Sequence, residues 1–168
     1  MKVLNFGSLN IDMVYSVDHV VRPGETTASA ELRYFCGGKG LNQSVALARA
    51  GAEVCHAGCV GADGGRLISL LRDNGVDTSL VTKSESPSGH AIIQVDRDGQ
   101  NSILLFGGAN MEITPEQIEN AVGNFSAGGR LFLQNEINGI SEIISAAHER
   151  GLEIVFTPSP FGAEILSY

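Results

Sequence analysis

Apolar and polar positions follow two different periodicities along the chain. Short apolar runs closed by glycine or polar residues are typical of buried strands, whereas apolar residues three and four apart indicate amphipathic helices. Core strands are expected at residues 3–6, 54–60, 131–134 and 153–157. Helices are expected at residues 41–50, 66–74 and 141–150, and another begins after Thr114. Strands alternating with helices predict an α/β fold, an open, mostly parallel sheet with helices on both faces.

The start of the helix after Thr114 has a specific capping pattern. Thr114 is a good N-cap residue, Pro115 suits the first helical position, and Gln117 can complete a capping box. The apolar pair Leu80-Val81 is expected to continue into a loop.

A second group of strands alternates apolar and polar residues. Two of them, at residues 13–17 and 28–36, are separated by the turn at residues 22–25. Two more, at residues 90–95 and 102–106, flank an Asp-Gly hairpin turn. Alternation indicates strands with one solvated face, so we expect a separate, small antiparallel sheet.

Composition and charge exclude several classes of protein. Hydrophobic residues make up 43% of the 168 residues, which is enough for a buried core, and no apolar run reaches the length of a membrane span. The first residues do not resemble a secretory signal, and three cysteines are an odd number, so we expect a reduced, cytoplasmic protein. The net charge of −8 lies entirely in the second half of the chain and argues against a nucleic-acid partner.

Three polar segments follow predicted strands, where open α/β sheets bind their ligands. They are residues 10–12, with Asn10 and Asp12, the glycine-rich residues 37–43, and Asn135-Glu136. Carboxylates, amides, an ammonium group and bare backbone N–H groups together suit a polyhydroxylated ligand, because each sugar hydroxyl both donates and accepts.

The glycine-rich segment does not fit the common phosphate-binding templates. Lys39 is followed by Gly40 rather than by Ser or Thr, and Gln43 stands where a dinucleotide fingerprint needs glycine. The segment is either a loop that approaches a ligand closely at a helix N-terminus or simply a tight turn between strand and helix.

Residues 37–52, Gly-Gly-Lys-Gly-Leu-Asn-Gln-Ser-Val-Ala-Leu-Ala-Arg-Ala-Gly-Ala, resemble the first signature of the ribokinase-like carbohydrate kinases, also called the phosphofructokinase-B family. Further segments resemble the family in its own order. They are residues 7–12, 23–26, 60–63, 107–110 and 133–136. The resemblance covers nearly the whole chain, and within the family it is closest to the ribokinases.

The resemblance implies a function and a set of site residues. It implies ATP-dependent phosphorylation of a small sugar, most readily ribose, with Mg²⁺ and in some members a monovalent cation. The sugar-binding residues would be Asn10, Asp12, Gly38, Lys39, Asn42 and Glu136. Residues 13–36 and 90–106 would form a β-lid that covers the sugar and pairs two subunits. Residues 1–12, 37–89 and 107–168 would form part of the α/β core.

The sequence also departs from the family pattern. The second signature, a Gly-Ala-Gly-Asp run that carries the catalytic base, is absent, as is the Asn-x-x-Glu motif that organises magnesium and phosphate. The resemblance therefore implies an N-terminal portion that carries the sugar side and no catalytic residue. One face of the last strand, or its edge, is then expected to lie uncovered. The alternatives are a non-catalytic sugar-binding or lid-mediated dimerisation module, or a kinase for fructose or a nucleoside.

Several of these residues also have a purely structural interpretation. Asp12 could stabilise a turn, Lys39 could be a solvated charge, and Glu136 could be a carboxylate at a helix N-terminus. Cys55, His56 and Cys59 do not predict a zinc site, because strand alternation puts the histidine on the opposite face from the two cysteines.

Overall fold

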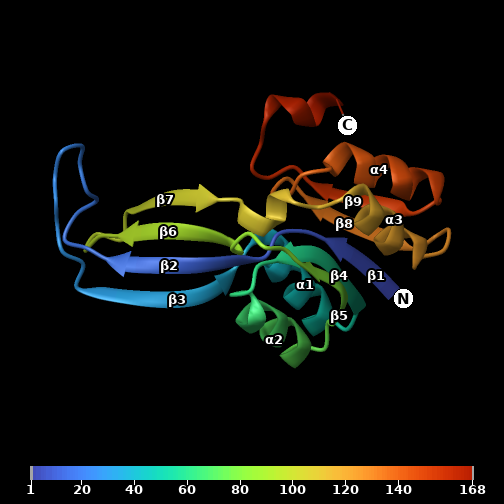
Figure 1. Ribbon diagram of the computed structural model, residues 1–168, viewed down its shortest axis with the longest axis horizontal. Coiled ribbons are helices and arrows are strands. Elements are labelled where there is room, and N and C mark those ends of the chain that lie inside the picture. The colour runs from blue at the N-terminus through green and yellow to red at the C-terminus, as the bar shows by residue number, and fades with distance from the viewer. Residues whose placement is uncertain (1, 168) are drawn as a thin grey trace.

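The computed structural model describes residues 2–167; Met1 and Tyr168, at the ends of the expected core ranges, lie outside it. Its larger sheet has five strands in the order β5-β4-β1-β8-β9, and every neighbouring pair is parallel. The strands are β1 (Lys2–Phe6), β4 (Glu53–Val60), β5 (Asp77–Lys83), β8 (Arg130–Gln134) and β9 (Glu153–Thr157). Figure 1 shows helices on both sides of this sheet, as the alternation of strands and helices predicts.

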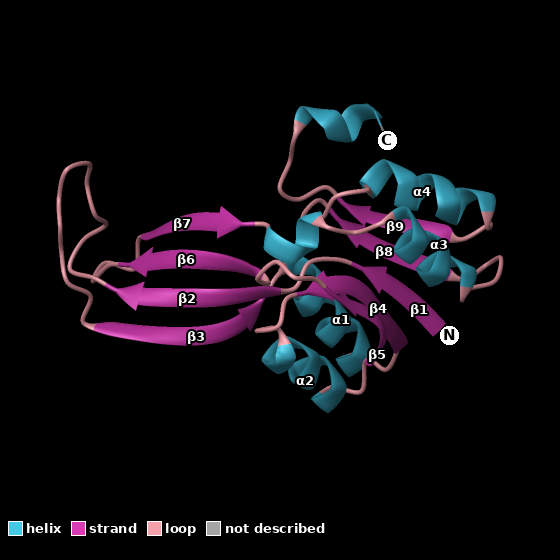
Figure 2. Ribbon diagram, in the orientation of Figure 1, coloured by secondary structure: helices cyan, strands magenta, loops and turns pink. Residues whose placement is uncertain are grey.

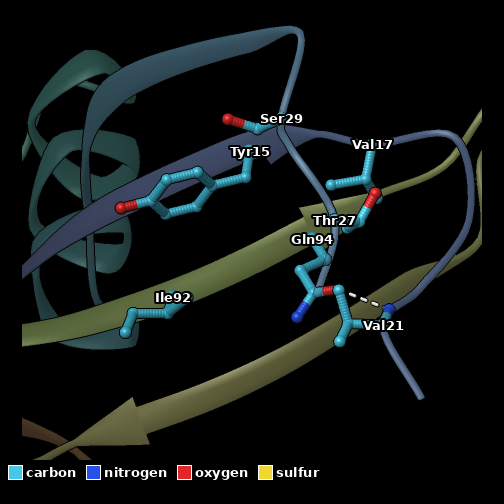
Figure 3. A pocket seen from close by; sticks show the side chains of 7 residues that line it. All are labelled: Tyr15, Val17, Val21, Thr27, Ser29, Ile92 and Gln94. Atoms are coloured by element: carbon cyan, nitrogen blue, oxygen red, sulfur yellow. Dashed lines mark hydrogen bonds between the residues drawn. The ribbon is translucent and has the colours of Figure 1, made fainter. Parts of the chain in front are cut away.

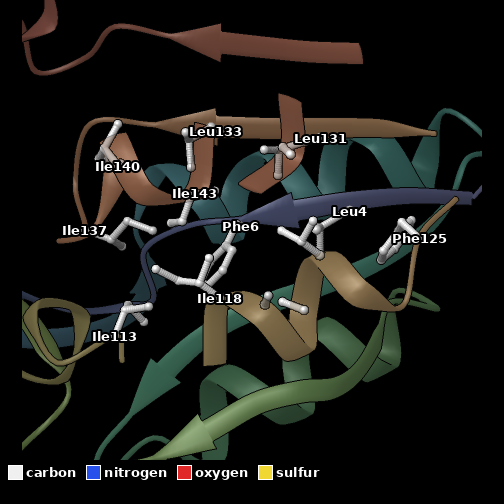
Figure 4. Packing of buried hydrophobic residues seen from close by; sticks show 14 of the residues in the cluster. Leu4, Phe6, Ile113, Ile118, Phe125, Leu131, Leu133, Ile137, Ile140 and Ile143 are labelled. Atoms are coloured by element: carbon white, nitrogen blue, oxygen red, sulfur yellow. The ribbon is translucent and has the colours of Figure 1, made fainter. Parts of the chain in front are cut away.

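Two separate apolar clusters hold the helices against the sheet. The cluster on one face joins Leu4 and Leu131 to α3 and α4, whose inward side chains include Ile118 and Ile143 (Figure 4). The cluster on the other face packs α1 and α2 against Val54 and Val60 of β4. The helices are α1 (Lys39–Arg49), α2 (Gly65–Asp73), α3 (Pro115–Gly123) and α4 (Ile140–Glu149). Burial on both faces explains why the central strands β1, β4 and β8 are mainly apolar.

The predicted capping box is confirmed at the start of α3. The Thr114 hydroxyl accepts a hydrogen bond from the Gln117 backbone N–H, and the Gln117 side chain accepts one from the Thr114 N–H in return. This exchange satisfies two of the N–H groups that the first turn of a helix leaves unpaired.

The second sheet has four strands in the order β3-β2-β6-β7 and projects from the core (Figure 2). Its strands are β2 (Asn10–Ser16), β3 (Glu31–Gly37), β6 (Gly89–Val95) and β7 (Asn101–Phe106). The prediction of an antiparallel sheet is wrong at its centre, because β2 and β6 are parallel. Both follow core strands that run the same way, β1 and β5, and therefore leave the core side by side in one direction.

Three local predictions also differ from the structure. Leu80 and Val81 lie within β5, where they pair with β4, so they are not the start of a loop. The strand β3 begins at Glu31 rather than at Ala28, and residues 31–35 are exposed on both faces rather than on one. A two-sided surface has no buried face to impose strict alternation. The strand β9 lies at one edge of the larger sheet, as expected.

Candidate functional site

A pocket of about 220 Å³ lies where the two sheets meet. Its polar lining contains all six residues that the sequence singles out, namely Asn10, Asp12, Gly38, Lys39, Asn42 and Glu136. Four apolar side chains complete it, and these the sequence analysis missed: Ala91 and Ile93 from β6, and Ile103 and Leu105 from β7. The sequence carries no signal for them, because they reach the pocket through the register of the second sheet, in which Asp12, Ala91 and Leu105 lie directly beside one another.

The six residues meet because the carboxyl ends of parallel strands share one edge of the sheet. Chain leaving β1 reaches Asn10 within four residues, and Glu136 lies two residues beyond β8. The first turn of α1 reaches the same edge because Gly38 and Gly40 allow its backbone to lie against the backbone of Ser8. A side chain at Gly40 would place its Cβ 2.4 Å from the Ser8 backbone nitrogen. Gly38 also has a φ of 96°, a conformation that favours glycine.

Glu136 is fully engaged by its neighbours in the pocket wall. Its Oε1 accepts from Lys39 Nζ at 2.7 Å, and its Oε2 accepts from the Lys39 backbone N–H at 2.9 Å and from Ser8 Oγ at 2.5 Å. Burial alone would raise the pKa of Glu136, but the hydrogen bonds from Lys39 and Ser8 outweigh it and the pKa is lowered. Glu136 is therefore an anion that holds Lys39 and the loop after β1 together.

Asp12 is the carboxylate that faces the pocket without a partner in residues 2–167. Partial burial, and then the negative charge of Glu136, raises its pKa. A carboxylate that is partly desolvated and receives no hydrogen bond from the protein is unfavourable, and its two oxygens accept strong hydrogen bonds from hydroxyl groups that reach them. This is the behaviour expected of a group whose partner is a polyhydroxylated ligand.

A polar network lies beneath the first turn of α1 and was not anticipated from the sequence. Asn5 Nδ2 donates to Ser44 Oγ at 2.7 Å and to the Gly40 carbonyl at 2.8 Å. Ser44 Oγ lies 2.8 Å from His56 Nδ1, and His56 Nε2 lies 3.2 Å from the Gly7 carbonyl. Complete burial lowers the pKa of His56 to about 4, so the ring is neutral at pH 7. The network anchors the turn that carries Lys39.

Two other cavities differ in their relation to the site. One of about 120 Å³ adjoins the pocket and shares Asn10, Leu105 and Glu136 with it, and Asn110 also lines this cavity. Another, of about 260 Å³, lies in the second sheet beneath residues 17–29 and is lined by Tyr15, Ile92 and Gln94 among others (Figure 3). None of the six predicted residues lines this distant cavity.

The part of the chain that the structure describes contains no cluster of side chains suited to bind a metal ion. No group of three or more His, Cys, Asp or Glu side chains converges in residues 2–167. Cys55 and Cys59 pack in the apolar cluster with α3 and α4, whereas His56 faces Ser44 in α1, so the predicted alternation is confirmed. Of the two carboxylates that line the pocket, Glu136 is neutralised by Lys39. The residues that the structure describes therefore do not form a ligand set for Mg²⁺.

No helix within residues 2–167 is both long enough and apolar enough to cross a membrane.

An open parallel sheet with a strand layer over a pocket at its carboxyl edge is the ribokinase fold. The structure superposes on ribokinase from Thermotoga maritima with a TM-score of 0.84 at 36% identity, covering 96% of this chain and 54% of that one. It superposes on ribokinase from Cryptococcus neoformans in complex with ADP with a TM-score of 0.83 at 36% identity, covering 98% and 51%.

Sequence comparison agrees with the fold. The family model described as pfkB family carbohydrate kinase matches residues 1–161. The chain is 35% identical to ribokinase of Haemophilus influenzae over 166 residues, covering 96% of this chain and 54% of that protein. It is 37% identical to ribokinase of Staphylococcus aureus over 176 residues, covering 99% and 58%. The chain belongs to the pfkB family of carbohydrate kinases, and it spans a little over half the length of these curated relatives.

Proposed function

We propose that the protein carrying this chain transfers a phosphoryl group from ATP to a primary hydroxyl of ribose, and that the pocket at the sheet junction holds the sugar. The observation that carries the proposal is the convergence of five polar residues and Gly38, from three segments, on one pocket of about 220 Å³. These segments are remote in sequence, and a shared lining is what a binding site requires of them.

The chemistry of the lining suits a sugar. Asp12 supplies acceptor atoms, Lys39 supplies donors, and the amides of Asn10 and Asn42 add further hydrogen-bonding groups. The apolar side chains from β6 and β7 give the C–H face of a sugar ring a surface to pack on. Such a lining would recognise a sugar that presents hydroxyl groups on one face and C–H groups on the other.

The named relatives support ribose as the acceptor. Two curated relatives above 30% identity are ribokinases. A solved structure at 29% identity, with a TM-score of 0.74 over 92% of this chain, is Arabidopsis thaliana ribokinase complexed with ribose and ATP. Because the chain spans little more than half of such proteins, the catalytic base and the groups that bind MgATP are proposed to lie outside the residues described here.

The second sheet is proposed to act as a lid. Its side chains Ala91, Ile93, Ile103 and Leu105 stand over the pocket. A closed apolar cover would exclude water, which otherwise competes with the sugar for the phosphoryl group. Positioning and electrostatic stabilisation are the main sources of catalysis in phosphoryl transfer.

The lid is also proposed to pair two copies of the protein. Large apolar side chains on it are exposed, namely Leu32, Tyr34, Phe35, Ile103, Leu104, Leu105 and Phe106. Monomeric soluble proteins rarely expose so many apolar side chains together. A second lid would cover them in a homodimer.

The test is a coupled assay of the complete gene product with MgATP and a panel of acceptors: ribose, 2-deoxyribose, fructose and adenosine. The proposal expects ribose to be phosphorylated with the highest kcat/KM. A folded protein that turns over none of them would overturn the kinase assignment, and a clear preference for fructose or adenosine would overturn the assignment of ribose.

A further inference from the structure

Asn110 is a buried side chain held by the backbone of a single residue. Its Oδ1 accepts from the Leu9 N–H at 2.9 Å, and its Nδ2 donates to the Leu9 carbonyl at 3.3 Å. A backbone N–H can only donate and a carbonyl can only accept. The reversed amide would therefore place donor against donor and acceptor against acceptor. The Leu9 N–H and carbonyl groups together therefore fix which way the Asn110 amide is oriented.

The same amide then fixes Asn10. Asn110 Nδ2 donates its second hydrogen to Asn10 Oδ1 at 2.7 Å. Because that contact requires an acceptor, Asn10 must turn its oxygen toward Asn110. The amide group is planar, so its Nδ2 lies on the other side. Asn10 is 7% exposed and lines the pocket, so Nδ2 is the atom that it offers there.

The surroundings leave this relay little freedom to move. A Cβ at Gly89, the first residue of β6, would lie 2.0 Å from Asn110 Nδ2 and 2.3 Å from Asn10 Oδ1, so any side chain there would separate the two amides. The backbone of the Asn110 segment is itself tied down, since Ala109 N donates to the Pro87 carbonyl at 2.9 Å and Asn110 N to the Gly107 carbonyl at 3.1 Å.

We propose that Asn110 is a specificity-determining positioning residue, which relays the polarity of the Leu9 backbone to Asn10 so that the pocket presents an N–H donor at this point. The sugar oxygen that meets Asn10 must then accept a hydrogen bond. A substituent that cannot accept is disfavoured there, whether it is a hydrogen atom or an ammonium group. This inference rests on the proposed sugar-binding function. It adds that, in the hydrogen bond between Asn10 and the sugar, the protein is the donor and the sugar oxygen is the acceptor.

The test uses ribose analogues in which one ring hydroxyl at a time is replaced by hydrogen or by fluorine. Fluorine retains a weak acceptor but cannot donate, and hydrogen can do neither. Calorimetric titration of the complete protein should find one ring position at which the fluoro analogue binds about threefold to tenfold tighter than the deoxy analogue.

Two variants move the donor in different ways. In Asn110→Asp, one carboxylate oxygen still accepts from Leu9 and the other faces Asn10, which must turn its Nδ2 away from the pocket. In Asn10→Asp, no donor remains at this position even if Asn110 is untouched, so the proposal stays testable if the first variant does not fold. Both should reduce the fluoro-to-deoxy affinity ratio at that position to about one or below. Asn124→Asp adds the same charge at the exposed end of α3 and should leave the ratio unchanged.

The failures can be told apart. If the folded wild-type protein binds neither ribose nor any analogue, the proposed function fails and this inference fails with it. If ribose binds but no ring position favours fluorine over hydrogen, or if Asn10→Asp retains the wild-type ratio, the sugar site stands and the relay from Asn110 to Asn10 is overturned.

Discussion

Lys39 and Glu136 meet twice at the pocket wall, once through the Lys39 ammonium group at 2.7 Å and once through its backbone N–H at 2.9 Å. The two contacts use both oxygens of the carboxylate. The Lys39 side chain is 41% exposed and the Glu136 side chain 9%. Lys39 can therefore still donate to a ligand. The hydrogen bonds of Glu136 to Lys39 also hold the first turn of α1 in place.

We expect Glu136→Gln to lower the free energy of unfolding by about 1 kcal/mol at pH 7, because the charge-assisted hydrogen bonds become neutral ones. The pKa of Glu136 is lowered from its ordinary 4.5. A lowered pKa stabilises the folded state above pH 4.5, and this contribution is lost as the pH falls through the lowered value. Urea denaturation at pH 7 and at a series of pH values below 4.5 should show the difference between wild type and variant shrinking as the pH falls. A difference that does not change with pH would mean that packing, not charge, is responsible.

Asp12→Ala should abolish measurable ribose binding with almost no loss of stability. Burial and the nearby charge of Glu136 raise the pKa of Asp12, so the ionised carboxylate slightly destabilises the folded protein. Ribose affinity by calorimetry and unfolding midpoint by circular dichroism measure the two effects. The matched control is Asp98→Ala, the same change at an exposed turn of the lid. Unchanged affinity in Asp12→Ala would refute its assignment.

His56 should make the protein less stable in mild acid. Its pKa is lowered by burial from 6.5 to about 4, so between these values the unfolded chain binds a proton that the folded protein does not. Stability must then fall as the pH decreases, by about 2 kcal/mol between pH 7 and pH 5. Denaturant unfolding at several pH values measures this slope. The variant His56→Phe should be less stable than the wild type at pH 7, since Ser44 and Gly7 lose a hydrogen-bond partner. The decrease in the free energy of unfolding that His56 causes between pH 7 and pH 5 should be absent in this variant.

The proposed dimer predicts that Leu104→Glu yields a monomer. Leu104 is 67% exposed on the lid, and a charge there could not be buried between two lids. Leu166→Glu is the matched control, an equally drastic change at an 81% exposed leucine outside the lid. Analytical ultracentrifugation should find dimers for the wild type and for the control. A monomeric wild type at concentrations of tens of micromolar would reject the dimer.

Much of the core could be predicted because local rules determine it. The Thr114 capping box depends on residues three apart, and the buried strands are mainly apolar runs. The convergence of Asp12 and Glu136 follows from one general rule about the edge of a parallel sheet. Their assignment as sugar ligands came from the family resemblance and is still a prediction.

The rest depends on which distant segments become neighbours. The parallel pairing of β2 with β6 joins residues that lie about 80 apart in the chain, as the pair Asn10 and Gly89 shows. The contact between Asn110 and Asn10 spans 100 residues, and that between Ser44 and His56 links a helix to a strand beneath it. No periodicity encodes such contacts, so the apolar wall of the pocket and the orienting amide emerged only from the structure.

A sugar is proposed to bind in the pocket that Asn10, Asp12 and Lys39 line. Backbone amide chemical shifts recorded during a ribose titration of the complete protein would locate it. We expect saturable shifts at Asp12, Lys39 and Asn42, and none at Tyr15 or Gln94 of the distant lid cavity. Shifts confined to that cavity, or no shifts at all at saturating ribose, would contradict this proposal.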